Sequence, residues 1–192
     1  MTHLPRQRVG WKWWRMGLWV VVGLMALLPS ISFAQAHPWE KKVVEICVPL
    51  GVPKPLALAF IDLESKGNPF AVNIAVKGAH EGFLPQNRKQ AHDLLDNALR
   101  QNQNIAIGLM QISYRHHRGA MKSNPHRFFD ADTNLAYGCQ YLAHLLREPG
   151  PLWQRLGRYY AASDVTLQQA YAKRVLKRMV RYLHPQNRRV TR

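Results

Sequence analysis

The spacing of apolar and polar residues predicts a mainly helical chain. Residues 56–61 are all apolar, and Leu63 continues the run, so a helix over residues 55–66 has no polar face and should be buried. Pro55 suits its first turn, and Gly67 followed by Pro69 suits its end. Periodic apolar positions predict further helices over residues 37–48, 91–99, 132–147, 152–160 and 166–183, with Asp132 as the N-cap of the 132–147 helix.

The segment between the predicted helices over residues 55–66 and 91–99 has a different pattern. Residues 68–85 contain Gly78, Gly82 and Pro85 around short apolar pieces, which predicts a small β-hairpin. Residues 105–113 form a short apolar segment, and the polar stretch 115–127 is expected to be a loop. Because no internal repeat or linker interrupts the pattern, the sequence predicts one mainly α (α+β) domain over residues 37–183 and a disordered basic tail over 184–192.

Residues 1–34 are expected to be a secretory signal peptide. Four basic residues precede an apolar stretch of 13 residues at positions 16–28, Pro29 ends it, and small residues up to Ala34 suit cleavage. A cut after Ala36 remains an alternative. An uncleaved anchor is the weaker interpretation, because a transmembrane helix needs about 20 apolar residues. The sequence therefore predicts export, with no membrane span after cleavage.

Export bears on the two cysteines and on the charge. An oxidising compartment favours pairing Cys47 with Cys139, the alternative being two buried free thiols.

The chain has a formal net charge of +16, and cleavage of the signal peptide would remove only four of its 27 Lys and Arg residues. This surplus suits a polyanionic partner, whether a cell-wall polymer, a membrane surface or a nucleic acid.

Glu64 is the candidate catalytic residue. It lies in the last turn of the apolar helix, facing the negative end of the helix dipole. Apolar surroundings also disfavour a charged carboxylate, so both effects raise its pKa toward the range of a general acid. The alternative is a glutamate at a helix end that simply reaches water.

Other chemistries find little support. Asp62 should point to another side of the helix, and the remaining candidates for a second carboxylate, Glu81, Asp93 and Asp96, are expected on solvated surfaces. The histidines lack the spacing of a zinc protease, and neither a serine-hydrolase elbow nor a phosphate-binding loop occurs. We therefore expect no metal and no cofactor.

Four segments together resemble the soluble lytic transglycosylases, enzymes with a goose-type-lysozyme-like fold. Residues 64–69 are similar to the catalytic signature of that family, 108–112 to its second motif, 134–142 to its third and 158–162 to its fourth. The hairpin between the first two motifs resembles the members that accompany conjugation, pilus and secretion systems. Those members carry cysteines positioned like Cys47 and Cys139, which favours the disulfide.

The resemblance implies a periplasmic enzyme that cleaves the β-1,4 bond between N-acetylmuramic acid and N-acetylglucosamine in peptidoglycan, with 1,6-anhydromuramic acid formation. Glu64 would be the acid and then the base. Tyr159, or its neighbour Tyr160 as the competitor, would hold the Glu64 carboxyl. The residues implied to bind substrate are Ser65, Met110, Gln111, Asn134, Tyr141 and Tyr159.

Three positions depart from the family pattern and leave room for alternatives. They are Ala106 and Ser113 around the second motif and Tyr160 in the fourth. A hydrolytic muramidase of the same fold and a non-catalytic wall-binding assembly factor remain alternatives. Nucleic-acid binding is not expected, because the export signal argues against it.

Overall fold

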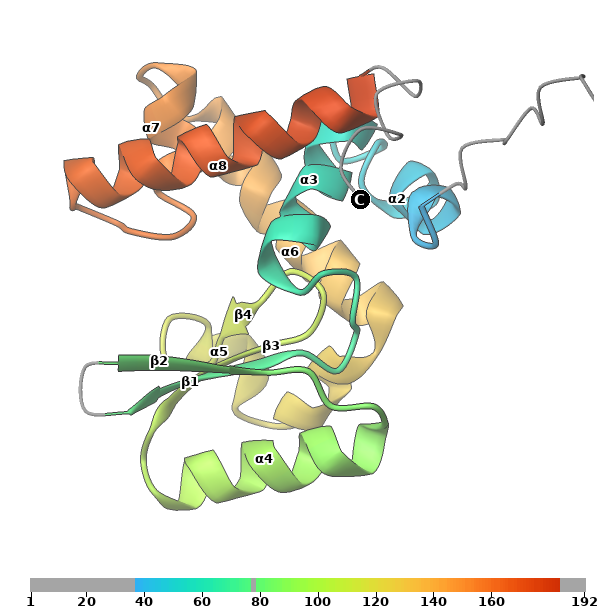
Figure 1. Ribbon diagram of the computed structural model, residues 1–192, viewed down its shortest axis with the longest axis vertical. Coiled ribbons are helices and arrows are strands. Elements are labelled where there is room, and N and C mark those ends of the chain that lie inside the picture. Colours follow the sequence, from blue (N-terminus) through green and yellow to red (C-terminus); the bar gives the residue numbers. More distant parts are fainter. Residues whose placement is uncertain (1–36, 77–78, 184–192) are drawn as a thin grey trace, which may run out of the picture. The chain divides into compact units, whose positions relative to one another are not determined.

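The computed structural model describes residues 37–76 and 79–183, and Figure 1 shows the arrangement of their helices and strands. The predicted signal peptide and the basic tail lie outside the described residues. No helix in these ranges combines the length and the apolar character that crossing a membrane requires. The helices are α2 (Glu40–Ile46), α3 (Lys54–Glu64), α4 (Arg88–Arg100), α5 (Arg118–Met121), α6 (Ala131–Arg147), α7 (Leu152–Gly157) and α8 (Val165–Leu183), with a 3₁₀ helix η1 at Pro125–Phe129.

The apolar helix predicted from the sequence is α3, and it is buried as expected. Residues 56–61 of α3 are almost inaccessible to solvent. Helix α8 packs along α3, and α2 also contacts α3 (Figure 1). Helix α8 turns Tyr171, Ala172 and Val175 inward, which matches its apolar stripe. The packing of α3 among other helices therefore fixes where Glu64, its last residue, lies.

The predicted hairpin is confirmed and belongs to a larger sheet. Strands β1 (Val72–Val76), β2 (Ala79–Phe83), β3 (Asn104–Ile107) and β4 (Ile112–Ser113) form an antiparallel sheet in the order β2-β1-β3-β4. The apolar segment 105–113, which carried no strand prediction, supplies most of β3 and all of β4. Helix α4 packs against β1 and β3, so one face of this small sheet is covered (Figure 1).

Two local predictions are wrong. The stretch 115–127 is not simply a loop, because it contains α5 and the start of η1. The N-cap of α6 is Asp130, whose carboxylate accepts a hydrogen bond of 2.9 Å from the Thr133 amide. Asp132 instead forms an ion pair with Lys42. Both aspartates precede the apolar stripe, and only the extended backbone at Asp130 allows the capping geometry.

The disulfide predicted between Cys47 and Cys139 is confirmed. Cys47 follows α2 and Cys139 lies in the middle of α6, with their Cα atoms 5.4 Å apart and both side chains buried. The bridge joins positions separated by 92 residues. It therefore fastens the N-terminal helix to the helix that carries the third motif.

Replacing both cysteines with serine should lower the free energy of unfolding by about 4 kcal/mol, because the unfolded chain loses a long covalent loop. Urea unfolding of the oxidised wild type and of the C47S/C139S variant measures the difference. Wild type unfolded in the presence of a reductant is the control, and it should lose a similar amount. Equal stability of oxidised and reduced wild type would contradict this prediction.

Candidate active site

Glu64 lies at a cavity of about 330 Å³ between α3, the sheet, the segment after α7 and α8. It ends α3, so the burial of that helix carries its carboxyl to the wall of the cavity. The polar residues that line this cavity are Glu64, Asn73, His80, Asn104, Gln111, Ser113, His116, Tyr159, Tyr160, Tyr171 and Arg174. Among the described lining residues, Glu64 is therefore the sole carboxylate.

Burial raises the pKa of Glu64 to about 7. A hydrogen bond from Tyr171 and the positive charges of Arg174 and Arg178 act in the opposite direction, but they do not cancel the loss of solvation. The direction of the pKa shift expected from the sequence is thus confirmed. A carboxyl with this pKa can both donate and accept a proton near neutral pH.

The tyrosine that holds the Glu64 carboxyl is Tyr171, so the expected role of Tyr159 or Tyr160 is corrected. The Tyr171 hydroxyl donates a hydrogen bond to Glu64 Oε1 across 107 positions of sequence. Tyr159 also lines the cavity, but its hydroxyl donates to the Met110 carbonyl oxygen at 2.8 Å. Tyr160 is 49% exposed and stacks on Tyr171, with ring centroids 5.2 Å apart.

The sequence contains a signal for Tyr171, although this residue lies outside the four motifs. Tyr171 belongs to the apolar stripe of the last helix, and it is almost fully buried. A buried tyrosine usually needs a partner for its hydroxyl. A buried carboxyl elsewhere in the chain is such a partner, but only the packing of α8 on α3 shows that the two meet.

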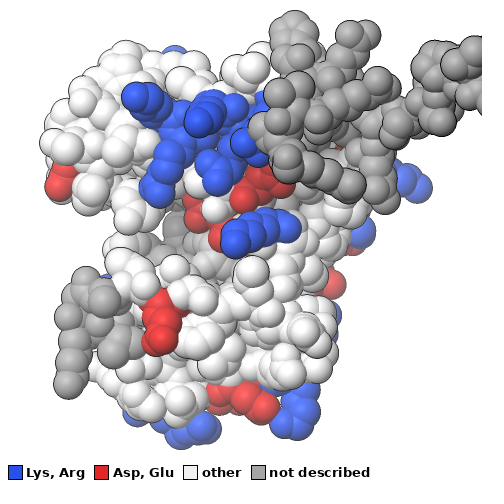
Figure 2. Space-filling view, in the orientation of Figure 1, with Lys and Arg blue, Asp and Glu red and all other residues white. Residues whose placement is uncertain are grey.

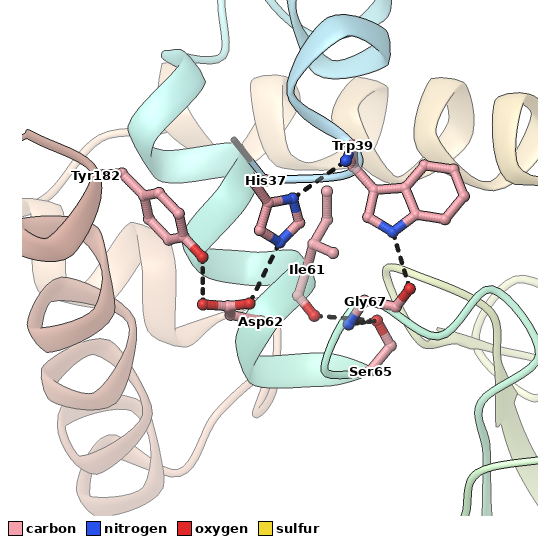
Figure 3. Close-up of polar contacts among 7 residues, drawn as sticks. All are labelled: His37, Trp39, Ile61, Asp62, Ser65, Gly67 and Tyr182. Atoms are coloured by element: carbon pink, nitrogen blue, oxygen red, sulfur yellow. Dashed lines mark hydrogen bonds and ion pairs between the residues drawn. The ribbon is translucent and has the colours of Figure 1, made fainter. Parts of the chain in front are cut away.

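Asp62 points away from the cavity, as its position two residues before Glu64 predicts. Figure 3 shows its carboxylate between Tyr182, which donates a hydrogen bond to Oδ2, and His37, whose Nε2 lies 3.3 Å from Oδ1. Burial opposes ionisation of Asp62, but the hydrogen bonds from His37 and Tyr182 outweigh it and lower its pKa. The two carboxyls of α3 therefore have opposite pKa shifts.

Ser65 shapes the turn after Glu64 and is not among the residues that line the cavity. Its side chain is buried, its hydroxyl donates to the Ile61 carbonyl oxygen at 3.0 Å, and it accepts from the Gly67 amide at 3.2 Å (Figure 3). The Trp39 indole donates to the Gly67 carbonyl oxygen at 2.8 Å. The expectation that Ser65 binds substrate is corrected, because both bonds of its hydroxyl are internal.

Met110 is also a core residue and not a groove residue. Its side chain is 0% exposed and lies against Gly138, where an added Cβ would come within 2.6 Å of Met110 Cβ. The glycine in the third motif therefore makes room for the methionine in the second. The expectation that Met110 binds substrate is corrected, because its side chain has no exposed surface.

Asn134 holds the second motif in place from within. It is 1% exposed, its Oδ1 accepts from the Met110 amide at 2.8 Å, and its Nδ2 donates to the carbonyl oxygens of Ile107 and Phe128 at 3.0 and 2.8 Å. Gly108 has φ +81°, and a Cβ there would lie 2.1 Å from Asn134 Nδ2. Asn134 is thus not in the groove, which corrects the expectation that it binds substrate.

Gln111 does line the cavity, as expected for a substrate-binding residue. Its Nε2 donates to the Ala71 and Gly108 carbonyl oxygens at 3.1 and 2.9 Å, which uses both amide protons. Only the amide oxygen of Gln111 is left to accept a hydrogen bond from a ligand. Its backbone, with φ +47°, lies in the left-handed region.

Tyr141 lies in a second cavity, of about 260 Å³, that adjoins the first. Gln111, Ser113, His116, Tyr159 and Tyr160 line both cavities. The Tyr141 ring packs 5.4 Å from the Tyr159 ring between centroids. The two cavities therefore form one groove that runs from Glu64 to Tyr141, with aromatic rings along one wall.

No group of three or more histidine, cysteine, aspartate or glutamate side chains in the described part of the chain could hold a metal ion. The polar groups that line the cavity with Glu64 are one carboxyl, tyrosine and serine hydroxyls, side-chain amides, imidazoles and a guanidinium group.

Residues 48–178 match the transglycosylase SLT domain family, and this match includes Glu64, the second and third motifs and most of α8. The chain belongs to this family, whose members are peptidoglycan lytic transglycosylases, lyases that act on glycan. The seven α-helices and the small antiparallel sheet of the described residues agree with its lysozyme-like α+β fold. No curated protein and no solved structure matches the chain.

The raised pKa of Glu64 should make stability fall as pH rises. The folded state keeps a proton up to pH about 7 that the unfolded state releases near pH 4.5, so the wild type loses up to about 3 kcal/mol across this window. Glu64→Gln removes the titration. The free energy of unfolding of the variant should equal that of the wild type at pH 4 and should be larger than that of the wild type at pH 8. Urea unfolding at both pH values measures this difference, and a difference that does not change with pH would mean that Glu64 titrates normally.

Proposed function

We propose that Glu64 cleaves the β-1,4 bond between N-acetylmuramic acid and N-acetylglucosamine and that the product carries a 1,6-anhydro ring. The observation that supports this most directly is a lone carboxyl with a pKa of about 7 in a groove that has no second carboxylate among its described lining residues. Glycosidases that use water or a covalent intermediate generally need two carboxylates. A single carboxyl that acts twice suits a reaction in which the sugar supplies its own nucleophile.

In the first step, protonated Glu64 donates its proton to the glycosidic oxygen of the leaving N-acetylglucosamine. The bond between this oxygen and C1 of the muramic acid breaks, and positive charge develops on the sugar ring. Because Tyr171 occupies Oε1, the carboxyl presents Oε2 to the glycosidic oxygen. The same hydrogen bond stabilises the carboxylate that the step leaves behind.

In the second step, the Glu64 carboxylate takes the proton from the 6-hydroxyl of the same muramic acid. The oxygen of this hydroxyl closes onto C1 and forms the anhydro ring. Glu64 ends the cycle protonated, as it began, and no water is consumed. A pKa near the working pH allows both transfers, since neither protonation state is strongly favoured over the other.

The remaining site residues would hold the glycan. Gln111 offers its amide oxygen to sugar hydroxyl or amide groups, and the rings of Tyr141 and Tyr159 offer apolar surface to sugar faces. The rival hydrolytic reaction lacks a second carboxylate to activate water among the described lining residues. A wall-binding factor without activity would have no need of the raised pKa.

The cellular setting belongs to the same proposal. The sequence pattern of residues 1–34 supports export to the periplasm, and the Cys47–Cys139 disulfide fits an oxidising compartment. The resemblance to members that accompany conjugation and secretion systems supports local opening of the wall for such an apparatus. The glycan strands of peptidoglycan are the substrate whether or not the enzyme serves such an apparatus.

Replacing Glu64 with glutamine should reduce release of soluble muropeptides from purified peptidoglycan by at least about 100-fold, because the general acid is lost. Mass spectrometry of the wild-type digest should show products one water lighter than hydrolytic ones. Glu81→Gln is the matched control, since Glu81 is exposed on β2 and does not line the cavity. Lysis by E64Q at the wild-type rate, or products of hydrolytic mass, would reject the proposal.

Replacing Tyr171 with phenylalanine should move the alkaline limb of the pH–rate profile to higher pH. The Tyr171 hydrogen bond lowers the pKa of Glu64, so its loss raises this pKa further above 7. Tyr182→Phe is the control, because it removes from the same helix a tyrosine hydroxyl whose partner is Asp62 and not Glu64. The two profiles would coincide if Tyr171 had no influence on the proton of Glu64.

A further inference from the structure

The outer side of α8 is strongly basic where it borders the groove. Figure 2 shows Lys and Arg side chains gathered over α8 beside the hollow in this face of the protein. The basic residues of this helix are Lys173, Arg174, Lys177, Arg178 and Arg181, and α8 contains no acidic residue. Of these five residues, only Arg174 lines the cavity that contains Glu64.

Arg174 is held at the groove by aromatic rings. Its guanidinium carbon lies 5.7 Å from the ring centroid of Tyr160 and 5.6 Å from that of Tyr171, and these two rings are nearly parallel. Stacking of this kind orients a guanidinium group and leaves its N–H groups free to bind an anion. Tyr171 in turn is fixed by its hydrogen bond to Glu64, so the position of Arg174 relative to the reacting carboxyl is defined.

The charge of Arg174 is not neutralised within the described structure. It makes no ion pair with any described carboxylate, whereas Arg158, which lines the adjoining cavity, is paired with Glu148 at 2.6 Å. When Glu64 is protonated and ready to act as an acid, the cavity wall around Arg174 contains no negative charge. A fixed cation without a partner beside a substrate groove is suited to bind an anionic group of the substrate.

The substrate offers one kind of anion. The sugar rings of the glycan are neutral, and its negative charge is on the substituent at O3 of muramic acid. That substituent carries carboxylates, either on the peptide stem or, where the stem is removed, on the lactyl group itself. We propose that Arg174 binds a carboxylate of this substituent, so that the enzyme prefers glycan with charged substituents over glycan with neutral ones. This inference rests on the proposed function and adds to it a specificity-determining residue.

The test compares purified peptidoglycan with the same material after carbodiimide and ammonia have converted its carboxylates to amides. Wild type should cleave the charged form about tenfold faster than the neutral form, as expected for one charge-assisted bidentate contact. Arg174→Gln should bring this ratio close to one, and Arg174→Lys should leave an intermediate ratio. Because each ratio compares two substrates of the same variant, any effect of Arg174 on the pKa of Glu64 cancels.

Lys177→Gln is the matched control. Lys177 lies on the next turn of α8, is exposed and does not line the cavity, so its loss should leave the ratio at the wild-type value. Equal rates of wild type on the two substrates would overturn the inference. So would an R174Q variant that keeps the wild-type ratio, or a K177Q variant that loses it to the same extent, since the latter would show general attraction by a basic helix.

A binding measurement separates this inference from the proposed reaction. In the Glu64→Gln background, cosedimentation with insoluble peptidoglycan should show tighter binding to the charged form, and the added R174Q change should abolish this preference. If the wild type released no anhydro product, the proposed reaction would be rejected. The binding measurement would still decide whether Arg174 recognises a carboxylate. Stem-free glycan, which is charged through its lactyl groups alone, identifies the carboxylate that Arg174 binds. If the preference for charged over amidated glycan is retained on this material, the carboxylate is that of the lactyl group. If the preference is lost, the carboxylate belongs to the peptide stem.

Discussion

The hydrogen bond between the Tyr171 hydroxyl and the Glu64 carboxyl joins the two helices on which the site depends. Helix α3 delivers the carboxyl to a poorly solvated position, which raises its pKa to about 7. Helix α8 delivers the hydroxyl, which limits this rise and fixes the orientation of the carboxyl. Burial and hydrogen bonding therefore act against each other on one group, and their balance leaves Glu64 able to exchange a proton near neutral pH.

The same stretch of α8 also supplies the cation at the groove. Tyr171 and Arg174 are three residues apart, so they lie on neighbouring positions of one helix face. The aromatic pair of Tyr160 and Tyr171 holds the guanidinium group, and Tyr171 holds the acid. One helix turn thus carries both the hydroxyl that binds Glu64 and the cation that we propose to bind the substrate.

Several residues of the family motifs build the groove without lining it. Asn134 satisfies three backbone groups around the second motif, and Gly138 leaves room for Met110. These contacts are buried, so their hydrogen bonds and packing hold the turn that places Gln111 at the cavity. Ser65 has the same kind of role at the end of α3. Such residues determine the shape of a binding surface through the backbone that they support.

The local pattern of this sequence was enough to predict α3, the hairpin, the raised pKa of Glu64 and the orientation of Asp62, because each depends on the spacing of residues within one element. Motif order was enough to indicate the family. The partner of Glu64 was decided by tertiary structure alone, since Tyr159, Tyr160 and Tyr171 all lie near the site and only the packing of α8 on α3 selects one hydroxyl. The Ser65 hydroxyl is bound within its own turn, by Ile61 and Gly67. Met110 and Asn134 are excluded from the groove by tertiary structure, because their burial depends on neighbours that are distant in the chain.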